Sequence, residues 1–214
     1  MKVIISGTSQ GIGRAMAVLF LNKDHEVIGV DKKDSSINHP RYTHVKKDIR
    51  DELPEVDNVN VIIANAGVQD EGEAIDVNLS ATIKFVEKYA TSIALSSVLF
   101  IASSSARNGA EFPLYSASKG GVITYMKNLA LRLSKNKVTV NSISPGGVVT
   151  PFNEHILNDE KLYEAVKNET LFHRWAEPEE IAEWAYFITV KNKSMTGEDI
   201  LIDNGEMLKS NFIW

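Results

Sequence analysis

A tyrosine and a lysine stand four residues apart in this chain, at Tyr115 and Lys119. On a helix, this spacing places both side chains on one face, about one turn apart. The lysine ammonium favours the phenolate, so the pKa of Tyr115 is expected to fall below its ordinary value of about 10. Such a phenol can donate or accept a proton near neutral pH. A packed ring beside a lysine whose stem lies on apolar surface has the same spacing, so the rest of the chain must decide between the two.

The composition is that of an ordinary globular protein. The 214 residues are 43% hydrophobic and 24% charged, which suits one well-packed domain over residues 1–214. A formal net charge of −5 gives no reason to expect a nucleic-acid partner. Cysteine is absent, which excludes disulfides, thiolate zinc sites and a cysteine nucleophile, and no metal site is predicted. Gly7 comes too early for a signal peptide, and no apolar run is long enough to span a membrane, so we expect a cytoplasmic protein.

A glycine-rich segment connects a predicted strand at 3–5 to a predicted helix that begins near residue 14. Glycines let the backbone turn sharply and approach an anion, while the helix N-terminus supplies N–H groups and the positive end of a dipole. Glycines alone are weak evidence for an anion site, because any tight strand-to-helix turn needs them. A strand before them and a helix after them make a phosphate-binding turn the better interpretation. The predicted dinucleotide-binding residues of this turn are Gly7, Ser9, Gln10, Gly11, Ile12 and Gly13.

Asp31 ends the second predicted strand, at the interval of about 20 residues that is expected after a dinucleotide-binding turn. A carboxylate there can accept hydrogen bonds from both hydroxyls of an adenosine ribose, and it would repel a 2′-phosphate. The turn itself contains no Arg or Lys. Both observations predict NAD as the cofactor, although Lys32 and Lys33 offset part of the Asp31 charge, which leaves NADP as the less favoured alternative.

Strands and helices alternate along the whole chain. Further strands are predicted at 42–45, 59–64, 97–102, 138–143 and 198–203, with helices at 76–93, from 115 to 133 and from 178 onward. This order predicts a single-domain α/β fold, a Rossmann-like doubly wound parallel sheet with helices on both faces and ligands at the carboxyl ends of the strands. The polar segment 151–175 is predicted to be a substrate lid.

The singled-out groups each follow a strand, so they are expected to converge on one edge of the sheet. Together they resemble the classical short-chain dehydrogenase/reductase family over nearly the whole chain. The matching positions are the glycine turn, Asp31, Asp48-Ile49, Asn65-Ala66-Gly67, Asn78, the serines 103–105, Tyr115-x-x-x-Lys119, Pro145-Gly146 with Thr150, and the helix start at 178–182.

The resemblance implies roles for these residues. Tyr115 would be the acid/base for the substrate oxygen, and Lys119 would lower the pKa of Tyr115 and bind the nicotinamide ribose. Asn78 would hold a water that links Lys119 to solvent. The other cofactor contacts implied are Asp48, Ile49, Asn65, Ala66, Gly67, Pro145, Gly146, Val148 and Thr150.

A serine is also implied as the hydrogen-bond donor to the substrate oxygen, and its position is open. The spacing that is usual in the family points to Ala102, which has no hydroxyl. Alignment of the strand that ends at Ala102 places the serine at Ser103 instead. Ser104 is the alternative, whereas Ser105 is expected to lie too far along the loop.

The function implied by the resemblance is an NAD(H)-dependent oxidoreductase that interconverts a secondary alcohol and a ketone of a small molecule. One alternative is a 3-oxoacyl-thioester (acyl carrier protein) reductase, which usually prefers NADPH and is disfavoured by Asp31. An alternative of another class is a dinucleotide-sensing binding protein without turnover. Such proteins normally lose the tyrosine or the lysine, and this chain keeps both.

The chain is shorter than the classical family form after Asp31 and again between Gly67 and Asn78. The second gap removes part of one wall of the substrate pocket, so we expect a smaller or more open site. In the family, the helices that contain Asn78 and Tyr115 pair across a dimer, which predicts a homodimer or homotetramer. The apolar end Phe212-Ile213-Trp214 is expected to dock on a neighbouring subunit or near the lid.

Overall fold

A seven-stranded parallel sheet organises the computed structural model, which describes residues 1–110 and 112–209. The strand order is β3-β2-β1-β4-β5-β6-β7, so the winding direction reverses between β1 and β4, where dinucleotides bind in such sheets. The predicted doubly wound, Rossmann-like fold is confirmed. The strands are β1 (Lys2–Ser6), β2 (Glu26–Asp31), β3 (Tyr42–Lys46), β4 (Val61–Ala64), β5 (Ser97–Ile101), β6 (Thr139–Pro145) and β7 (Asp199–Ile202).

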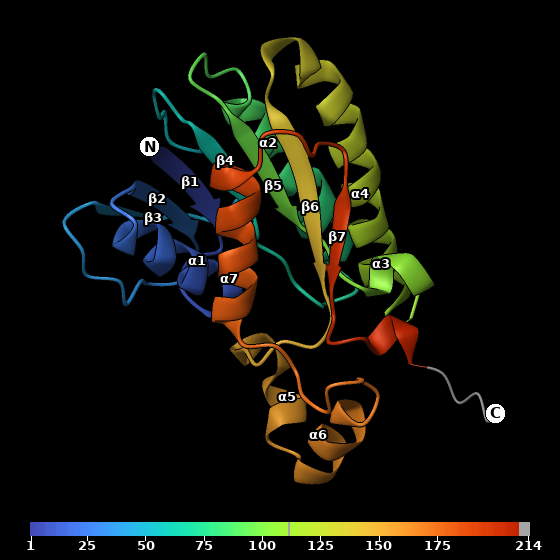
Figure 1. Cartoon of the computed structure of the whole chain (residues 1–214). Helices are drawn as coiled ribbons and strands as arrows, with labels where there is room; N and C mark the ends of the chain where they lie inside the picture. Colours follow the sequence, from blue (N-terminus) through green and yellow to red (C-terminus); the bar gives the residue numbers. More distant parts are fainter. Residues whose placement is uncertain (111, 210–214) are drawn as a thin grey trace.

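Helices cover both faces of the sheet (Figure 1). On one face, α1 (Gly11–Asn22) lies beside α7 (Pro178–Tyr186), and Met16, Phe20 and Ile143 belong to the core beneath them. On the other face lie α2 (Thr82–Tyr89) and the long α4 (Pro113–Leu133), with Phe85 and Phe100 in their core. Because both faces are covered, all residues of β4 and β5 are buried, which explains why these strands are apolar apart from Ser97.

The observed helix differs at both ends from the helix predicted at 76–93. It starts with a π-helical segment, η1 (Ile75–Ala81), and α2 ends at Tyr89, so the prediction of helix up to Ile93 is wrong. Ile93 is 99% exposed in the turn beyond the helix. In this turn the Ser92 hydroxyl donates to the Val59 carbonyl at 2.9 Å. This bond holds the chain where it turns back toward the start of β5.

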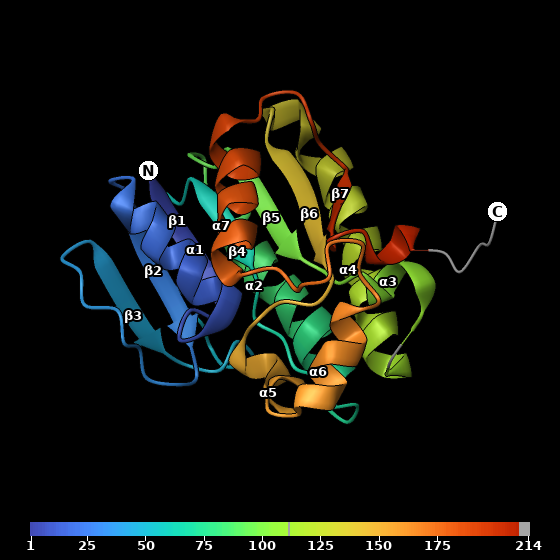
Figure 2. The ribbon, with the colours of Figure 1, turned by 60° about the horizontal axis from the view of Figure 1, so that its bottom comes forward.

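Short helices complete the chain. The segment 151–175 contains η3 (Pro151–Asn153), α5 (Glu154–Leu157) and α6 (Glu160–Lys167), and it lies in front of the carboxyl ends of the strands (Figure 2). The others are α3 (Ser105–Asn108), η2 (Ser134–Asn136), η4 (Phe187–Lys191) and η5 (Glu206–Leu208). None of the described helices is long and apolar enough to cross a membrane. The segment Phe212-Ile213-Trp214, for which docking is predicted, lies outside the described residues.

Candidate active site

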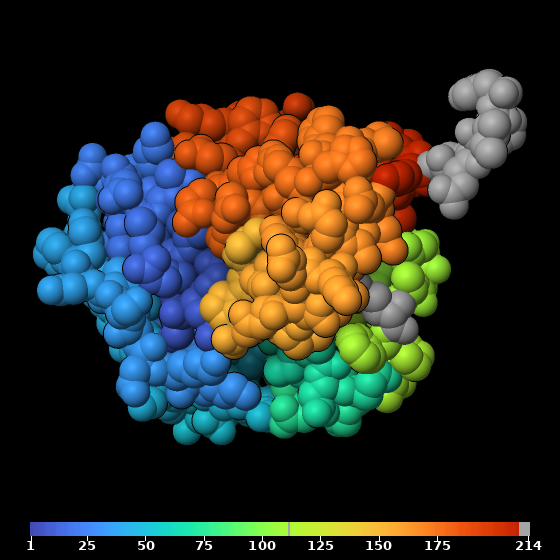
Figure 3. Space-filling model, turned by 90° about the horizontal axis from the view of Figure 1, so that it is seen from below, coloured from blue at the N-terminus to red at the C-terminus, as the bar shows by residue number. Residues whose placement is uncertain are grey.

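A cavity of about 830 Å³ opens at the carboxyl ends of β1, β2, β4, β5 and β6. Its size lies within the range of small-molecule and cofactor sites, about 300–1,000 Å³. The recess is visible between the segment 151–175 and the N-terminal half of the chain (Figure 3). The cavity brings together the predicted site residues of both the cofactor and the catalytic groups, except Ser9 and Asn78, which do not line it.

The glycine turn leaves no room for larger residues. Gly7 and Gly11 have φ angles of 77° and 53°, a backbone conformation that favours glycine. A Cβ atom on Gly13 would stand 1.9 Å from the Gly7 carbonyl oxygen. Asn65 donates from Nδ2 to the Ser6 and Gly7 carbonyls at 3.0 Å, so the end of β4 is tied to the turn. This close cradle at the start of α1 fits a dinucleotide diphosphate.

Asp31 is held in place by backbone donors. Its Oδ2 accepts from the Ser9 N–H at 2.9 Å, and its Oδ1 accepts from the Lys33 N–H at the same distance. Ser9 therefore orients Asp31 rather than lining the cavity. The Lys33 ammonium donates to Gln10 Oε1 at 2.9 Å, which puts a cation at the glycine turn, on the edge of the cavity where Asp31 lies.

Asp48 lines the cavity but is already paired with Arg50. The guanidinium donates to both carboxylate oxygens, at 3.0 and 2.8 Å, and these hydrogen bonds lower the pKa of Asp48. Arg50 also pairs with Glu73 at 2.9 Å, a connection that sequence reasoning missed. Ile49 is buried in the core and contributes one apolar edge of the cavity.

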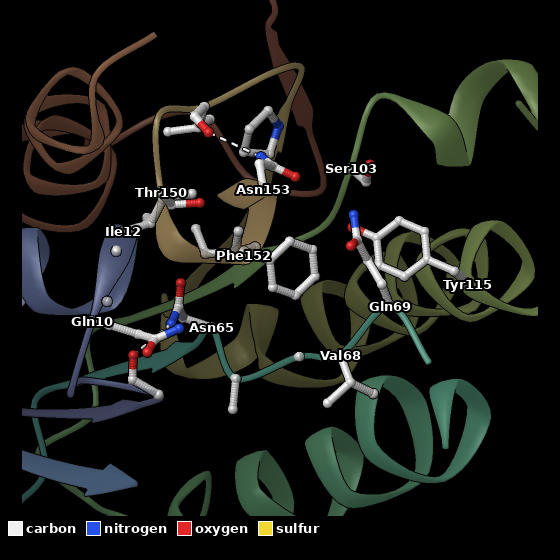
Figure 4. A pocket seen from close by; sticks show the side chains of 18 of the residues that line it. Gln10, Ile12, Asn65, Val68, Gln69, Ser103, Tyr115, Thr150, Phe152 and Asn153 are labelled. Carbon is white, nitrogen blue, oxygen red and sulfur yellow. Dashed lines mark hydrogen bonds between the residues drawn. The ribbon is translucent and has the colours of Figure 1, made fainter. Parts of the chain in front are cut away.

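Tyr115 and Lys119 lie in the first turns of α4 and face the cavity. They are 7% and 5% exposed, and the Lys119 ammonium stands 5.8 Å from the centre of the Tyr115 ring. Nζ donates to the Ile101 carbonyl at 2.9 Å, and burial lowers the pKa of Lys119 to about 8. The Tyr115 ring points into the cavity toward Phe152, with ring centres 6.5 Å apart (Figure 4). Both residues line the cavity, which favours the chemical interpretation of the pair over simple packing.

Asn78 connects two elements around this pair. It is 1% exposed on η1, and its Oδ1 accepts from the Val68 N–H at 2.8 Å. Its Nδ2 donates to the Val68 carbonyl at 2.9 Å and to the Ser118 hydroxyl at 3.1 Å. The amide thus fixes the chain after β4 against α4. π-Helical turns are frequent at functional sites. Here a Cβ atom on Gly67 would stand 3.1 Å from Asn78 Oδ1 and 3.3 Å from Lys119 Nζ, so both side chains lie against Gly67.

Two serines after β5 line the cavity, Ser103 and Ser104, whereas Ser105 does not. The Ser103 hydroxyl accepts from the Ser105 hydroxyl at 2.8 Å and from the Ser105 N–H at 3.2 Å. Ser105 therefore orients Ser103. Ser103 lies on the Tyr115 side of the cavity (Figure 4).

The loop that contains these serines is fixed by an ion pair that sequence reasoning missed. Arg107 donates from Nε and Nη2 to the Asp199 carboxylate at 2.9 and 2.7 Å. Asp199, with a side chain that is 9% exposed, also accepts from the hydroxyls of Ser142 and Ser144 on β6 at 2.6 and 2.8 Å. The two partners are 92 residues apart, so only the sheet brings them together.

Asp199→Ala is expected to lower the free energy of unfolding by about 2–4 kcal/mol, because it leaves an arginine and two buried hydroxyls without their acceptor. Urea unfolding measures this loss. Asp34→Ala is the control, since it breaks a pair with Lys46 in which the Asp34 side chain is 84% exposed, and its unfolding midpoint should match that of the unaltered protein. Equal midpoints for both variants would refute the role given to Asp199.

Comparisons with known proteins agree with this geometry. A family model described as Enoyl-(Acyl carrier protein) reductase matches residues 55–206. The chain is 28% identical to Glucose 1-dehydrogenase of Gluconobacter oxydans (strain 621H), across 99% of this chain and 93% of that protein. It is 25% identical to a 3-oxoacyl-(acyl-carrier-protein) reductase of Buchnera aphidicola, across 94% and 95%.

Among solved structures, a short chain dehydrogenase family protein from Francisella tularensis superposes with a TM-score of 0.86. The two chains are 27% identical, and the match covers 97% of this chain and 99% of the other. The family model matches well over half of the chain, and the superposition extends the likeness to almost all of it. The chain therefore belongs to the short-chain dehydrogenase/reductase family of oxidoreductases.

Proposed function

We propose that this protein is an NAD(H)-dependent oxidoreductase that interconverts a secondary alcohol and a ketone, with Tyr115 as the acid/base. The observation that carries the proposal is one continuous cavity. It is lined by the glycine turn and Asp31 and also by Tyr115 and Lys119. A dinucleotide held by the turn and a substrate beside Tyr115 can therefore share the same space.

The residues of the chain supply position and proton transfer, and a bound nicotinamide supplies or accepts the hydride. Tyr115 gives a proton to the carbonyl oxygen during reduction and takes it back during oxidation. Lys119, whose pKa is about 8, is mostly protonated at pH 7 and stabilises the phenolate. Ser103 donates a hydrogen bond to the substrate oxygen, with Ser104 as the alternative, and Asn78 holds a water that connects Lys119 to solvent.

We assign each of the remaining lining residues to one part of the dinucleotide. The glycine turn would bind the diphosphate, Asp31 would bind the adenosine ribose, and Asp48 with Ile49 would border the adenine. The segment 65–67 and the Lys119 ammonium would contact the nicotinamide ribose. The carboxamide contacts are assigned to Pro145, Gly146, Val148 and Thr150.

The lining around Tyr115 favours an uncharged, hydroxyl-rich substrate. Besides the residues assigned to the dinucleotide, aromatic, polar and acidic side chains line the cavity: Phe112, Phe152, Trp175, Gln69, His155, Glu169 and Glu206. Of these, Phe152 and Gln69 lie beside Tyr115 (Figure 4). The lysines at the other end, Lys32, Lys33 and Lys47, lie with Asp31 and Asp48. Aromatic faces and hydrogen-bonding groups suit a sugar or polyol, which is also what the name of the Gluconobacter relative describes. A 3-oxoacyl thioester on an anionic carrier is the second candidate, and the Buchnera relative is the reason to keep it.

A substrate screen tests the proposed function. NAD is supplied with aldoses and polyols, and NADH with small ketones and with acetoacetyl-coenzyme A, and absorbance at 340 nm is followed. We expect turnover of at least one sugar or polyol and little turnover of the thioester. Tight NADH binding without turnover of any compound would favour a non-catalytic dinucleotide sensor.

The cofactor preference is a separate prediction. NADH is expected to bind about tenfold more tightly than NADPH, or about 1.4 kcal/mol, because the Asp31 carboxylate repels a 2′-phosphate and Lys33 offsets only part of that repulsion. Fluorescence titration of both cofactors measures the ratio, and Asp31→Ser should remove the preference. Equal or reversed affinities in the unaltered protein would instead indicate that Lys33 pairs with the 2′-phosphate.

A further inference from the structure

Glu71 is bonded to the backbone of the helix that contains Tyr115. Its Oε2 accepts from the Leu114 N–H at 2.9 Å, and its Oε1 accepts from the Tyr115 N–H at 3.0 Å. The residue before the helix, Phe112, gives no side-chain cap, and Pro113 has no N–H to donate. Glu71 is half-buried and has no cation paired with it among the described residues. The cap of α4 therefore comes from a residue that is 44 positions from Tyr115 in sequence.

The segment 68–73, here called the wall segment, contains Glu71 and occupies the shortened stretch between Gly67 and Asn78. Its first residue is fixed by Asn78, which bonds both the N–H and the carbonyl of Val68. Gln69 and Asp70 line the cavity. Gln69 points into the cavity beside Tyr115 (Figure 4). The wall segment thus presents side chains to the space where a substrate would meet Tyr115.

We propose that Glu71 is a positioning residue for the reaction, which ties the wall segment to the first turn of α4 and so fixes Gln69 relative to Tyr115. The proposal rests on the proposed function. A carboxylate that accepts two N–H groups at a helix N-terminus makes charge-assisted hydrogen bonds in a favourable dipole field. Asn78 still holds Val68 against α4 when this tie is lost, but the part of the wall segment beyond Val68 can then shift relative to the first turn of α4. A displacement of about 1 Å at a reacting centre can cost about 100-fold in rate.

Asn192 offers a matched control for a side chain that accepts two N–H groups without this coupling. Its Oδ1 accepts from the N–H groups of Ser194 and Met195 at 3.1 and 2.8 Å, in the turn after η4. Asn192 does not line the cavity and is close to both donors in sequence. Asn192→Ala therefore removes the acceptor of two N–H groups but no tie between distant segments.

The kinetic experiment compares Glu71→Ala, Glu71→Gln and Asn192→Ala, with the sugar or polyol that the screen identifies. Glu71→Ala is expected to lower kcat about 10- to 100-fold and to leave the Kd of NADH within twofold. Glu71→Gln should recover only part of kcat, because its one amide oxygen can still accept from the helix while its NH2 group cannot accept from the second N–H group. Both alanine variants should lower the Tm by a few degrees, about what the loss of a capping side chain costs, while Asn192→Ala keeps kcat within twofold.

Amide hydrogen exchange on the full-length protein provides a readout that needs no turnover. Glu71→Ala should accelerate exchange in 113–118 and also in the wall segment, 68–73. Faster exchange in 113–118 alone, or unchanged kcat in Glu71→Ala, would reduce Glu71 to an ordinary cap and overturn the proposal. If the unaltered protein turns over no compound of the screen, the proposed function fails, and the exchange of 68–73 still decides whether Glu71 holds the wall segment.

Discussion

Replacing Tyr115 with phenylalanine is expected to lower kcat by about 10²- to 10⁴-fold, the range that general acid–base catalysis supplies. The ring would keep its place opposite Phe152, and only the proton donor would be lost. The Kd of NADH should stay within about twofold, because the glycine turn and Asp31 are unchanged. Initial rates at 340 nm with a turned-over sugar or polyol, together with a fluorescence titration of NADH, measure both quantities.

Tyr125→Phe is the matched control, because Tyr125 lies on the same helix but does not line the cavity. Its hydroxyl donates to Glu87 at 2.5 Å, so the variant can lose stability, yet kcat should change less than twofold. A full rate in Tyr115→Phe would show that another group moves the proton.

Replacing Lys119 with methionine is expected to abolish turnover and to stabilise the cofactor-free protein at pH 7. Burial lowers the pKa of Lys119 to about 8, against about 10.4 in an unfolded chain. Between these values the unfolded state binds more protons, so the stability of the unaltered protein rises with pH across that window. Below pH 8 the full cost of the buried charge is present, about 3 kcal/mol, and the loss of the bond to the Ile101 carbonyl reduces the gain to about 2 kcal/mol.

Urea unfolding at pH 7, 9 and 10.5 tests this expectation. The stability difference between Lys119→Met and the unaltered protein should be largest at pH 7 and should shrink at each higher pH. Lys127→Met is the control, since Lys127 is exposed on the same helix and its replacement should have no such pH dependence. A Lys119→Met protein that is less stable at pH 7 would contradict the cost assigned to the buried ammonium.

The sequence was sufficient to predict the parallel sheet and the edge of the sheet at which the cavity lies. Parallel strands covered on both faces are near-continuous apolar runs, and β4 and β5 are recognisable on that basis alone. The carboxyl ends of parallel strands share one edge, so the grouping of Asp31, Asn65 and the serines after β5 followed from topology.

Long-range partners could not be predicted in this way. Glu71 and Tyr115 are 44 residues apart, and Arg107 and Asp199 are 92 apart. Neither the Glu71 carboxylate in its loop nor the Asp199 carboxylate at the start of β7 carries a local sequence signal for the donor that it meets, because tertiary structure alone sets that distance. The predicted end of the helix at Ile93 was wrong for a similar reason. The apolar pattern continues to Ile93, while the turn into β5 ends α2 at Tyr89.

Transfer of deuterium from NADH labelled at the reactive hydride position of nicotinamide C4 tests whether the protein carries out the proposed reaction with Tyr115 as the acid/base. The ketone that corresponds to the turned-over alcohol is incubated with the labelled cofactor, and the product is analysed by mass spectrometry. One deuterium is expected in the product alcohol with the unaltered protein and almost none with Tyr115→Phe in the same time. Bound labelled cofactor with no deuterium in any product, or equal transfer by Tyr115→Phe, would contradict this expectation.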